Sequence, residues 1–154
     1  MKKLLLTEVA LRDGSHVVGH QFTKEQVRNV TKQLSAAGVP YIEVTHGDGL
    51  GGSSLQYGFS KEYDIELVKV AVEQAGNSTI AVLLLPGIGT IEDLKKAYDA
   101  GARMVRVATH VTEADVSKQH IETAKAMGME VVGFLMMAHS ASPEVVLEQA
   151  KLME

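Results

Sequence analysis

The chain has 154 residues, of which 45% are hydrophobic and 22% are charged, and its formal net charge is −4. This is the balance of an ordinary globular domain, and the lack of a basic run excludes a surface that follows a phosphate backbone, so nucleic acid is not an expected partner. The chain has no cysteine, which excludes a disulfide framework, thiolate metal sites and a cysteine nucleophile.

The first six residues resemble the start of an export signal. The apolar run ends at Thr7-Glu8, which is too early for an export segment. No stretch approaches the roughly 18 apolar residues of a membrane span. We therefore expect a cytoplasmic protein that does not cross a membrane.

Five short apolar runs, rich in Val, Ile and Leu, recur along the chain and are predicted strands. In chain order they are Leu4–Leu11, Tyr41–Val44, Thr79–Leu85, Met104–Ala108 and Glu130–Met136. They show little alternation of apolar and polar residues, which is typical of strands that are covered on both faces.

The amphipathic segments between these runs are predicted helices. The first begins with a capping box, because Thr23 can cap the helix and Gln26 can reach back to it. The fifth begins at Ser142, and Pro143 suits the first helical position. The second helix is indicated by apolar residues at helical spacing from Ile65 to Val72. The third is predicted to start at residues 90–93, and the fourth at Thr112-Glu113-Ala114-Asp115.

A weak internal repeat supports this order of elements. Its copies are 37–44, 100–107 and 127–134. Each has a glycine, namely Gly38, Gly101 or Gly128, where a helix is expected to end in left-handed geometry, and a strand a few residues later. Strand and helix alternate throughout, which predicts a parallel sheet with right-handed crossovers.

Five strand–helix units fit either of two architectures. They could form an open doubly wound sheet, or five-eighths of a parallel α/β barrel, for which about 250 residues is typical. The last helical pattern reaches Met153 without a Gly or Asn cap, and the chain stops at Glu154. We therefore expect residues 1–154 to be the amino-terminal part of one TIM-barrel-type domain. An incomplete barrel leaves two sheet edges unpaired, so we also expect self-association.

In parallel α/β folds ligands bind at the carboxyl ends of the strands, and the loop after the first run is the most informative. Asp13 offers a hard oxygen ligand for Mg²⁺ or Mn²⁺, and Arg12 offers a planar guanidinium for a carboxylate or an enolate. His16 can move a proton near neutral pH. Together they provide metal binding, charge stabilisation and a base for carbon–carbon cleavage beside a carbonyl. The alternative is a local Arg12–Asp13 ion pair beside a solvated His16.

The second loop, from His46 to Tyr63, is long and rich in glycine. Its length favours a functional role, and we expect either a mobile lid or gate, or a phosphate cradle formed by Ser53-Ser54 at a helix start. It lacks the Gly-Lys-Ser/Thr ending of a Walker motif. The segment Pro86-Gly87-Ile88-Gly89 is expected to be a tight turn rather than an anion site.

Several other polar residues lie at or inside the predicted strands. His110 and His139 stand near strand ends and could line a pocket, whereas His120 is expected to be a surface or packing residue. Glu43 and Arg106 lie inside strand patterns, so each is expected to be buried and paired, or to face a polar barrel centre. The pattern leaves open whether they pair with each other.

Much of the chain resembles the 4-hydroxy-2-oxovalerate aldolase family. The resemblance is carried, in order, by residues 11–16, 43–54, 83–90, 105–110, 112–117 and 133–137. The Arg-Asp-Gly triplet alone is shared with a wider superfamily of metal-dependent barrel aldolases and acyl-transferring synthases. The string at 43–54 is far more specific.

The resemblance implies a TIM barrel that binds Mn²⁺ or a similar divalent ion and cleaves 4-hydroxy-2-oxo acids to pyruvate and a short aldehyde, a step of aromatic hydrocarbon catabolism. It also implies a complex with an acylating acetaldehyde dehydrogenase, which receives the aldehyde. By the family's motif, Asp13 is a metal ligand and contacts the substrate. Arg12 binds the substrate and stabilises the pyruvate enolate, and His16 takes the proton of the 4-hydroxyl group.

The family also has features that would fall beyond Glu154: a His-x-His pair of metal ligands, a late Tyr near the substrate and a partner-binding region. One carboxylate cannot hold Mn²⁺ tightly, because such ions take about six ligands. We therefore expect this chain alone to be inactive or nearly so. Two alternatives stay open, a superfamily member that uses acyl-coenzyme A and a non-catalytic, self-associating α/β module.

Overall fold

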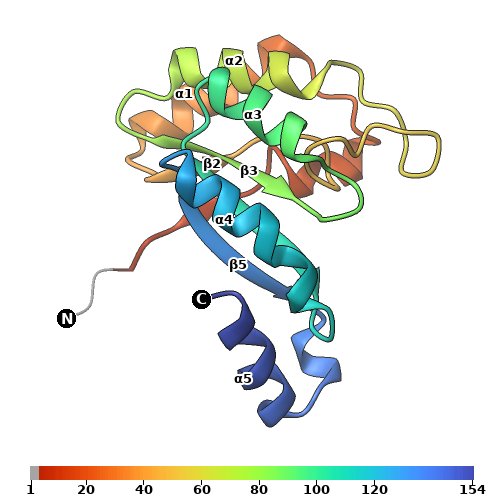
Figure 1. Cartoon of the computed structure of the whole chain (residues 1–154). Coiled ribbons are helices and arrows are strands. Elements are labelled where there is room, and N and C mark those ends of the chain that lie inside the picture. The colour runs from red at the N-terminus through yellow and green to blue at the C-terminus, as the bar shows by residue number, and fades with distance from the viewer. Residues whose placement is uncertain (1–3) are drawn as a thin grey trace.

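A computed structural model describes residues 4–154, in which five parallel strands form one sheet (Figure 1). The strands are β1 (Thr7–Glu8), β2 (Tyr41–Glu43), β3 (Thr79–Leu84), β4 (Met104–His110) and β5 (Glu130–Met136). The helices are α1 (Lys24–Ala36), α2 (Asp64–Gln74), α3 (Ile91–Asp99), α4 (Lys118–Ala126) and α5 (Pro143–Leu152). Among the described residues, no helix has both the length and the apolar character needed to cross a membrane.

The order of the strands decides between the two architectures that the sequence left open. The sheet runs β1-β2-β3-β4-β5 in sequence order, so each strand pairs with the next one along the chain. A doubly wound sheet reverses its strand order near the middle, whereas a barrel does not. Consecutive helices from α1 to α4 also pack against each other. The fold is therefore the barrel-type arrangement, with five strand–helix units described.

Most helix boundaries follow from local chemistry and confirm the predictions. Thr23 accepts a hydrogen bond from the backbone N–H of Gln26, and the Gln26 side chain accepts one from Thr23, which completes the capping box. Thr90 does the same with Asp93, and Ser142 caps α5 ahead of Pro143. The three repeat glycines all have positive φ, as predicted.

The predicted start of the fourth helix was wrong. Residues 114–117 form a 3₁₀ turn, named η2 (Ala114–Ser117), and α4 begins only at Lys118. Thr112 is not available as a cap, because its hydroxyl lies 2.9 Å from His110 Nδ1. The Ser117 hydroxyl instead donates to the Ala114 carbonyl at 2.6 Å, which closes the 3₁₀ turn.

Four strand lengths also differ from the prediction: β2 and β3 each end one residue early, and β1 and β4 differ by more. Only Thr7–Glu8 of the run 4–11 pairs with β2, because the backbone then turns: the N–H groups of Arg12 and Asp13 both donate to the Val9 carbonyl. This turn leads into η1, a 3₁₀ helix from Asp13 to Val18. β4 continues to His110, two residues beyond its predicted end, so His110 lies inside the strand.

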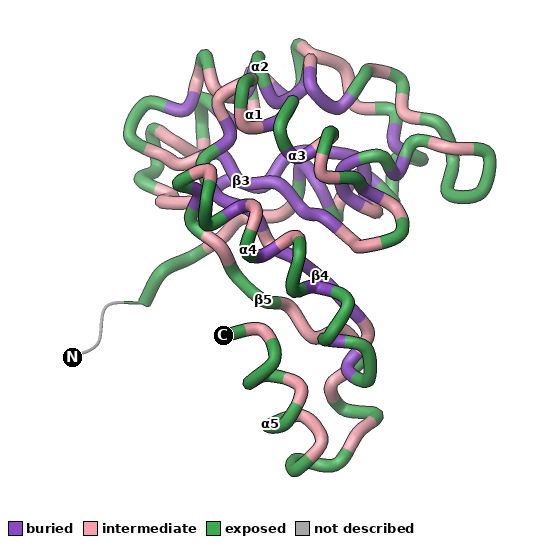
Figure 2. Tube along the Cα trace, in the orientation of Figure 1, coloured by how far each residue is buried: buried purple, intermediate pink, exposed green. Residues whose placement is uncertain are grey.

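The core lies between the strands and helices α1 to α4, and β5 and α5 are left at its margin. Figure 2 shows buried residues along β3 and β4, and exposed or half-buried ones along β5 and α5. The prediction of strands covered on both faces is confirmed for β3, where residues 80–84 are buried. It was wrong for β5, an edge strand without a buried residue.

Exposed β5 leads to a prediction about self-association. One side of β5 pairs with β4, and no other strand of residues 4–154 pairs with its other side. We expect the chain, of 16.6 kDa, to sediment as a dimer or larger species, because such edges recruit further strands. Val132→Lys, a charge placed on exposed β5, should shift the population toward monomer. The control Leu55→Lys, on an exposed loop position, should not. A wild-type chain that sediments as a 16.6 kDa monomer would contradict the prediction.

Candidate active site

A pocket of about 230 Å³ opens at the carboxyl ends of the strands. Arg12, Asp13 and His16 line it from the turn after β1 and from η1. The structure therefore brings together the three residues that the sequence singled out. The rest of the lining is Gly47, Asp48, Leu83, Leu85, Phe134 and Met136.

The Glu43 carboxylate holds two arginines beneath this pocket. Glu43 is completely buried. Arg12 Nε donates to Glu43 Oε1 at 2.5 Å, and Arg106 Nε and Nη2 donate to Oε2 and Oε1 at 2.6 and 2.9 Å. The sequence left the pairing of Glu43 with Arg106 open, and the structure shows it, with Arg12 as a third member. Such charge-assisted pairs offset the cost of burying a carboxylate.

The remaining contacts of Arg12 fix its guanidinium in the pocket wall. Its Nη1 donates to Asp13 Oδ1 at 2.8 Å and to the Gly47 carbonyl at 3.3 Å. The local ion pair that was the alternative to a catalytic role is thus present. It does not occupy Asp13 fully, because the Asp13 side chain is 62% exposed and only Oδ1 contacts Arg12. A free carboxylate oxygen fits Mg²⁺ or Mn²⁺, although it supplies few of about six ligands.

Three histidines stand beside the arginine cluster. The rings of His16 and His20 meet edge to face at 4.9 Å, and His20 stacks on His46 at 3.6 Å between ring centroids. His16 is exposed, whereas His20 and His46 are buried. Burial is the main cause that lowers the pKa of both buried rings, which favours their neutral forms. His20 was missed in the sequence because it follows no strand end. Its spacing of four residues from His16 was the available signal.

The buried histidines fasten the long loop 46–63 to the rest of the site. The backbone N–H of Asp48 donates to His46 Nδ1 at 3.0 Å, and His46 Nε2 lies 3.1 Å from the Gly58 carbonyl. The backbone N–H of His46 donates to Asp64 Oδ1 at 2.9 Å, and that of Lys61 donates to the His20 carbonyl at 3.1 Å. The loop base is thus held to η1 and to the start of α2.

The phosphate cradle proposed for this loop is not borne out. Ser53 Oγ accepts from the backbone N–H of Ser60 at 2.9 Å, and Ser54 Oγ accepts from that of Tyr57 at 3.2 Å. The next helix begins only at Asp64, so no helix start lies at Ser53-Ser54. The lid or gating role stays a prediction. The segment 86–89 is the tight turn that was expected, since the N–H groups of Ile88 and Gly89 donate to the Leu85 carbonyl.

One group of side chains within residues 4–154 could hold a metal ion. It consists of His16, His20 and Asp48, whose ligand atoms all lie within 4.8 Å of one another. Asp13, the ligand expected from the sequence, is not part of this group. Asp13 nevertheless lines the same pocket as His16 and Asp48.

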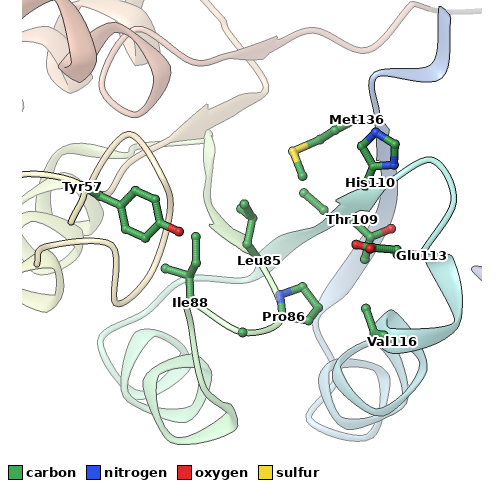
Figure 3. Close-up of a pocket in the computed structure, with 11 residues that line it drawn as sticks. Tyr57, Leu85, Pro86, Ile88, Thr109, His110, Glu113, Val116 and Met136 are labelled. Atoms are coloured by element: carbon green, nitrogen blue, oxygen red, sulfur yellow. The ribbon is translucent and has the colours of Figure 1, made fainter. Parts of the chain in front are cut away.

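A second pocket, of about 340 Å³, adjoins the first and shares Leu85 and Met136 with it (Figure 3). Figure 3 shows Tyr57, from the long loop, on one side and His110 and Glu113 on the other. The expectation that His110 lines a pocket is therefore confirmed. His139 is exposed in a separate 3₁₀ turn, residues 138–140, and does not line either pocket.

Comparisons with known proteins agree with this geometry. A family model described as HMGL-like matches residues 3–154. The 4-hydroxy-2-oxovalerate aldolases of Bacillus cereus and Geobacillus stearothermophilus are 65% and 64% identical over 149 residues, which are 97% of this chain and 44% of each relative. The chain therefore spans less than half the length of these curated relatives.

A solved structure is similar at the level of the fold alone. The carboxyl transferase domain of Rhizobium etli pyruvate carboxylase, with pyruvate and biocytin, aligns with a TM-score of 0.72 at 13% identity. The alignment covers 99% of this chain and 29% of that one.

The buried arginine cluster predicts a large effect of removing its negative charge. Glu43→Gln keeps the shape of the side chain and leaves Arg12 and Arg106 without a buried counter-charge. We expect the free energy of unfolding in urea to fall by about 3–5 kcal/mol. Glu92→Gln is the control, because the exposed Glu92–Lys95 pair contributes little. Equal stability of the two variants would disprove the central role of Glu43.

The buried Asp64 predicts a pH dependence of stability. Burial raises the pKa of Asp64 from 3.8 to about 6. The native state therefore binds this proton more tightly than the unfolded state. The contribution of Asp64 to the free energy of unfolding is favourable at low pH and is lost as the pH rises toward 6.

The matching variant is Asp64→Asn, which cannot titrate and can still accept the His46 hydrogen bond. In urea unfolding across this pH range, the free energy of unfolding of the variant should rise relative to that of the wild type by up to about 3 kcal/mol as the pH rises. A difference that stays constant with pH would contradict this assignment.

Proposed function

The chain belongs to the HMGL-like family, and we propose that it is the amino-terminal part of a divalent-metal-dependent aldolase barrel. The proposed reaction cleaves 4-hydroxy-2-oxopentanoate, or a related 4-hydroxy-2-oxo acid, to pyruvate and a short aldehyde. The observation that carries the proposal is the placement of Arg12, Asp13 and His16 around one pocket at the carboxyl ends of the strands. The names of the relatives supply the substrate class.

The contacts of each residue match a step of this cleavage. His16 is exposed and free to accept the proton of the 4-hydroxyl group. The bond between carbons 3 and 4 then breaks, its electron pair stays with the three-carbon fragment as an enolate, and carbon 4 leaves as the aldehyde. The Arg12 guanidinium, held by Glu43, stabilises the enolate charge without having to reorganise. Protonation of carbon 3 completes pyruvate.

Asp13 is the proposed ligand of the divalent ion, for which Mn²⁺ is our candidate. When bound, such an ion withdraws electron density from the 2-oxo group. The exposed carboxylate of Asp13 fits this role, yet the ion needs further ligands. We therefore propose that the 154-residue chain alone is inactive or nearly so.

The proposal extends to a cytoplasmic location and to a partner. An acylating acetaldehyde dehydrogenase would consume the aldehyde, as the family resemblance implies. A non-catalytic, self-associating module is the second candidate, and the exposed faces of β5 and α5 favour it.

The test compares the protein that the native gene produces with this 154-residue chain. The intact mass of the product is measured, and both proteins are assayed for Mn²⁺-dependent release of pyruvate from 4-hydroxy-2-oxopentanoate. We expect the product to be longer and active. Arg12→Ala and His16→Ala should each lower its kcat by about 10²-fold or more, whereas His139→Ala, away from both pockets, should not.

Several outcomes would contradict the proposal. Turnover of acyl-coenzyme A substrates in place of the 2-oxo acid would assign a different reaction within the family. Full activity of the Arg12 and His16 variants would remove the assigned roles. Turnover by the 154-residue chain at the rate of the longer product would overturn its proposed inactivity.

A further inference from the structure

We propose that His16, His20 and Asp48 form a second metal site, which takes a transition-metal ion of the Zn²⁺ type and is distinct from the site assigned to Asp13. Occupation of this site withdraws His16 from proton transfer and so inhibits cleavage. The binding of the ion stands on geometry alone, whereas the inhibition rests on the proposed function.

The backbone brings the three side chains together from two segments. His16 lies in η1, and the left-handed residues Gly19 and His20, with φ of 57° and 62°, turn the chain back. Asp48 comes from the loop after β2, which packs on η1. Gly47 allows this approach, because a Cβ there would lie 2.4 Å from His16 Nε2. The ligand atoms of the three residues consequently lie within 4.8 Å of one another.

The ligand set selects the kind of ion. Two imidazoles and one carboxylate are typical of zinc and related ions, whereas Mg²⁺ and Ca²⁺ prefer oxygen ligands throughout. Zinc lies about 2.0–2.2 Å from such ligands, so the three groups must close in slightly. His16 is exposed and Asp48 is half-buried, which leaves both free to make this movement around the buried His20.

Neighbouring groups hold the ligands as an outer shell would. Ser15 Oγ lies 3.1 Å from His20 Nδ1, and the His46 ring stacks behind His20 at 3.6 Å. Asp48 Oδ2 lies 3.5 Å from His46 Nδ1. Contacts of this kind orient the ligands of metal sites and sustain affinity.

The proposed site differs from the Asp13 site in its ligands and in its consequence, although Asp13, His16 and Asp48 line the same pocket. Asp13 Oδ1 pairs with Arg12 and takes no part in the three-residue group. A ring nitrogen of His16 that donates its lone pair to an ion cannot accept the 4-hydroxyl proton. An ion at Asp13 would favour the reaction, and an ion at the second site would stop it.

Calorimetric titration of the 154-residue chain with ZnCl₂ tests binding without any enzyme assay. We expect one Zn²⁺ per chain, and an affinity lowered by about tenfold or more in His16→Ala and in Asp48→Asn. These positions are exposed or half-buried, so both variants should fold, and urea unfolding checks that they do. His139→Ala and Asp13→Asn are the controls and should keep the wild-type affinity. No binding, binding that survives both ligand variants, or binding lost in Asp13→Asn would overturn the site.

A second measurement separates the site from the proposed function. In the Mn²⁺-dependent assay of the natural gene product, added Zn²⁺ should lower pyruvate release by about tenfold, and Asp48→Asn should lose most of this inhibition relative to its own zinc-free rate. Equal inhibition of the wild type and Asp48→Asn would overturn the inhibitory role. Zinc binding by a product that cleaves no 2-oxo acid would support the site and reject the proposed aldolase instead.

Discussion

The candidate site depends on one buried carboxylate. Glu43 has no exposed surface and accepts hydrogen bonds from Arg12 and Arg106. These contacts tie the turn after β1 to β2 and β4, so three separate segments share one ionic cluster. A carboxylate buried without such partners would be strongly unfavourable, which makes the three residues interdependent. The orientation of Arg12 in the pocket follows from this cluster, and Arg12 in turn contacts Asp13 and Gly47.

The stacked histidines provide a second constraint, on the loop after β2. His20 and His46 are buried against each other, and both contact the backbone of the loop after β2. Two neutral rings stack without cost, whereas two charged rings at 3.6 Å would repel each other. The lowered pKa of each ring therefore fits a structural role in holding the loop. His16, which is exposed beside them, is the ring left for chemistry.

The distribution of burial separates the chain into a well-packed part and an exposed margin. The strands β3 and β4 are largely buried under the helices, whereas β5 and α5 contain no buried residue. Apolar side chains such as Val132, Leu147 and Leu152 are accordingly exposed there. The candidate site lies where these parts meet, since Phe134 and Met136 of β5 complete a pocket built mainly by the earlier segments.

The sequence by itself determined the features that arise from neighbouring residues. The capping box at Thr23, the helix start at residues 90–93 and the left-handed turns at the repeat glycines need only a few adjacent side chains, and the structure confirms them. Arg12, Asp13 and His16 were identified together for the same reason, because one short loop carries all three. The length of β1 was misjudged, since apolar composition does not reveal a turn formed by backbone hydrogen bonds to Val9.

Only the tertiary structure decided which distant residues meet. Glu43 pairs with Ala81 and Arg106 with Leu83 across the sheet, and positions 81 and 83 share one face of β3. This register places Glu43 and Arg106 on the same face although 63 residues separate them. The strand order β1 to β5 and the meeting of His20 with His46 and Asp48 likewise depend on how separate segments pack. Periodicity along the chain reports which residues are buried, but not the register that selects their partners.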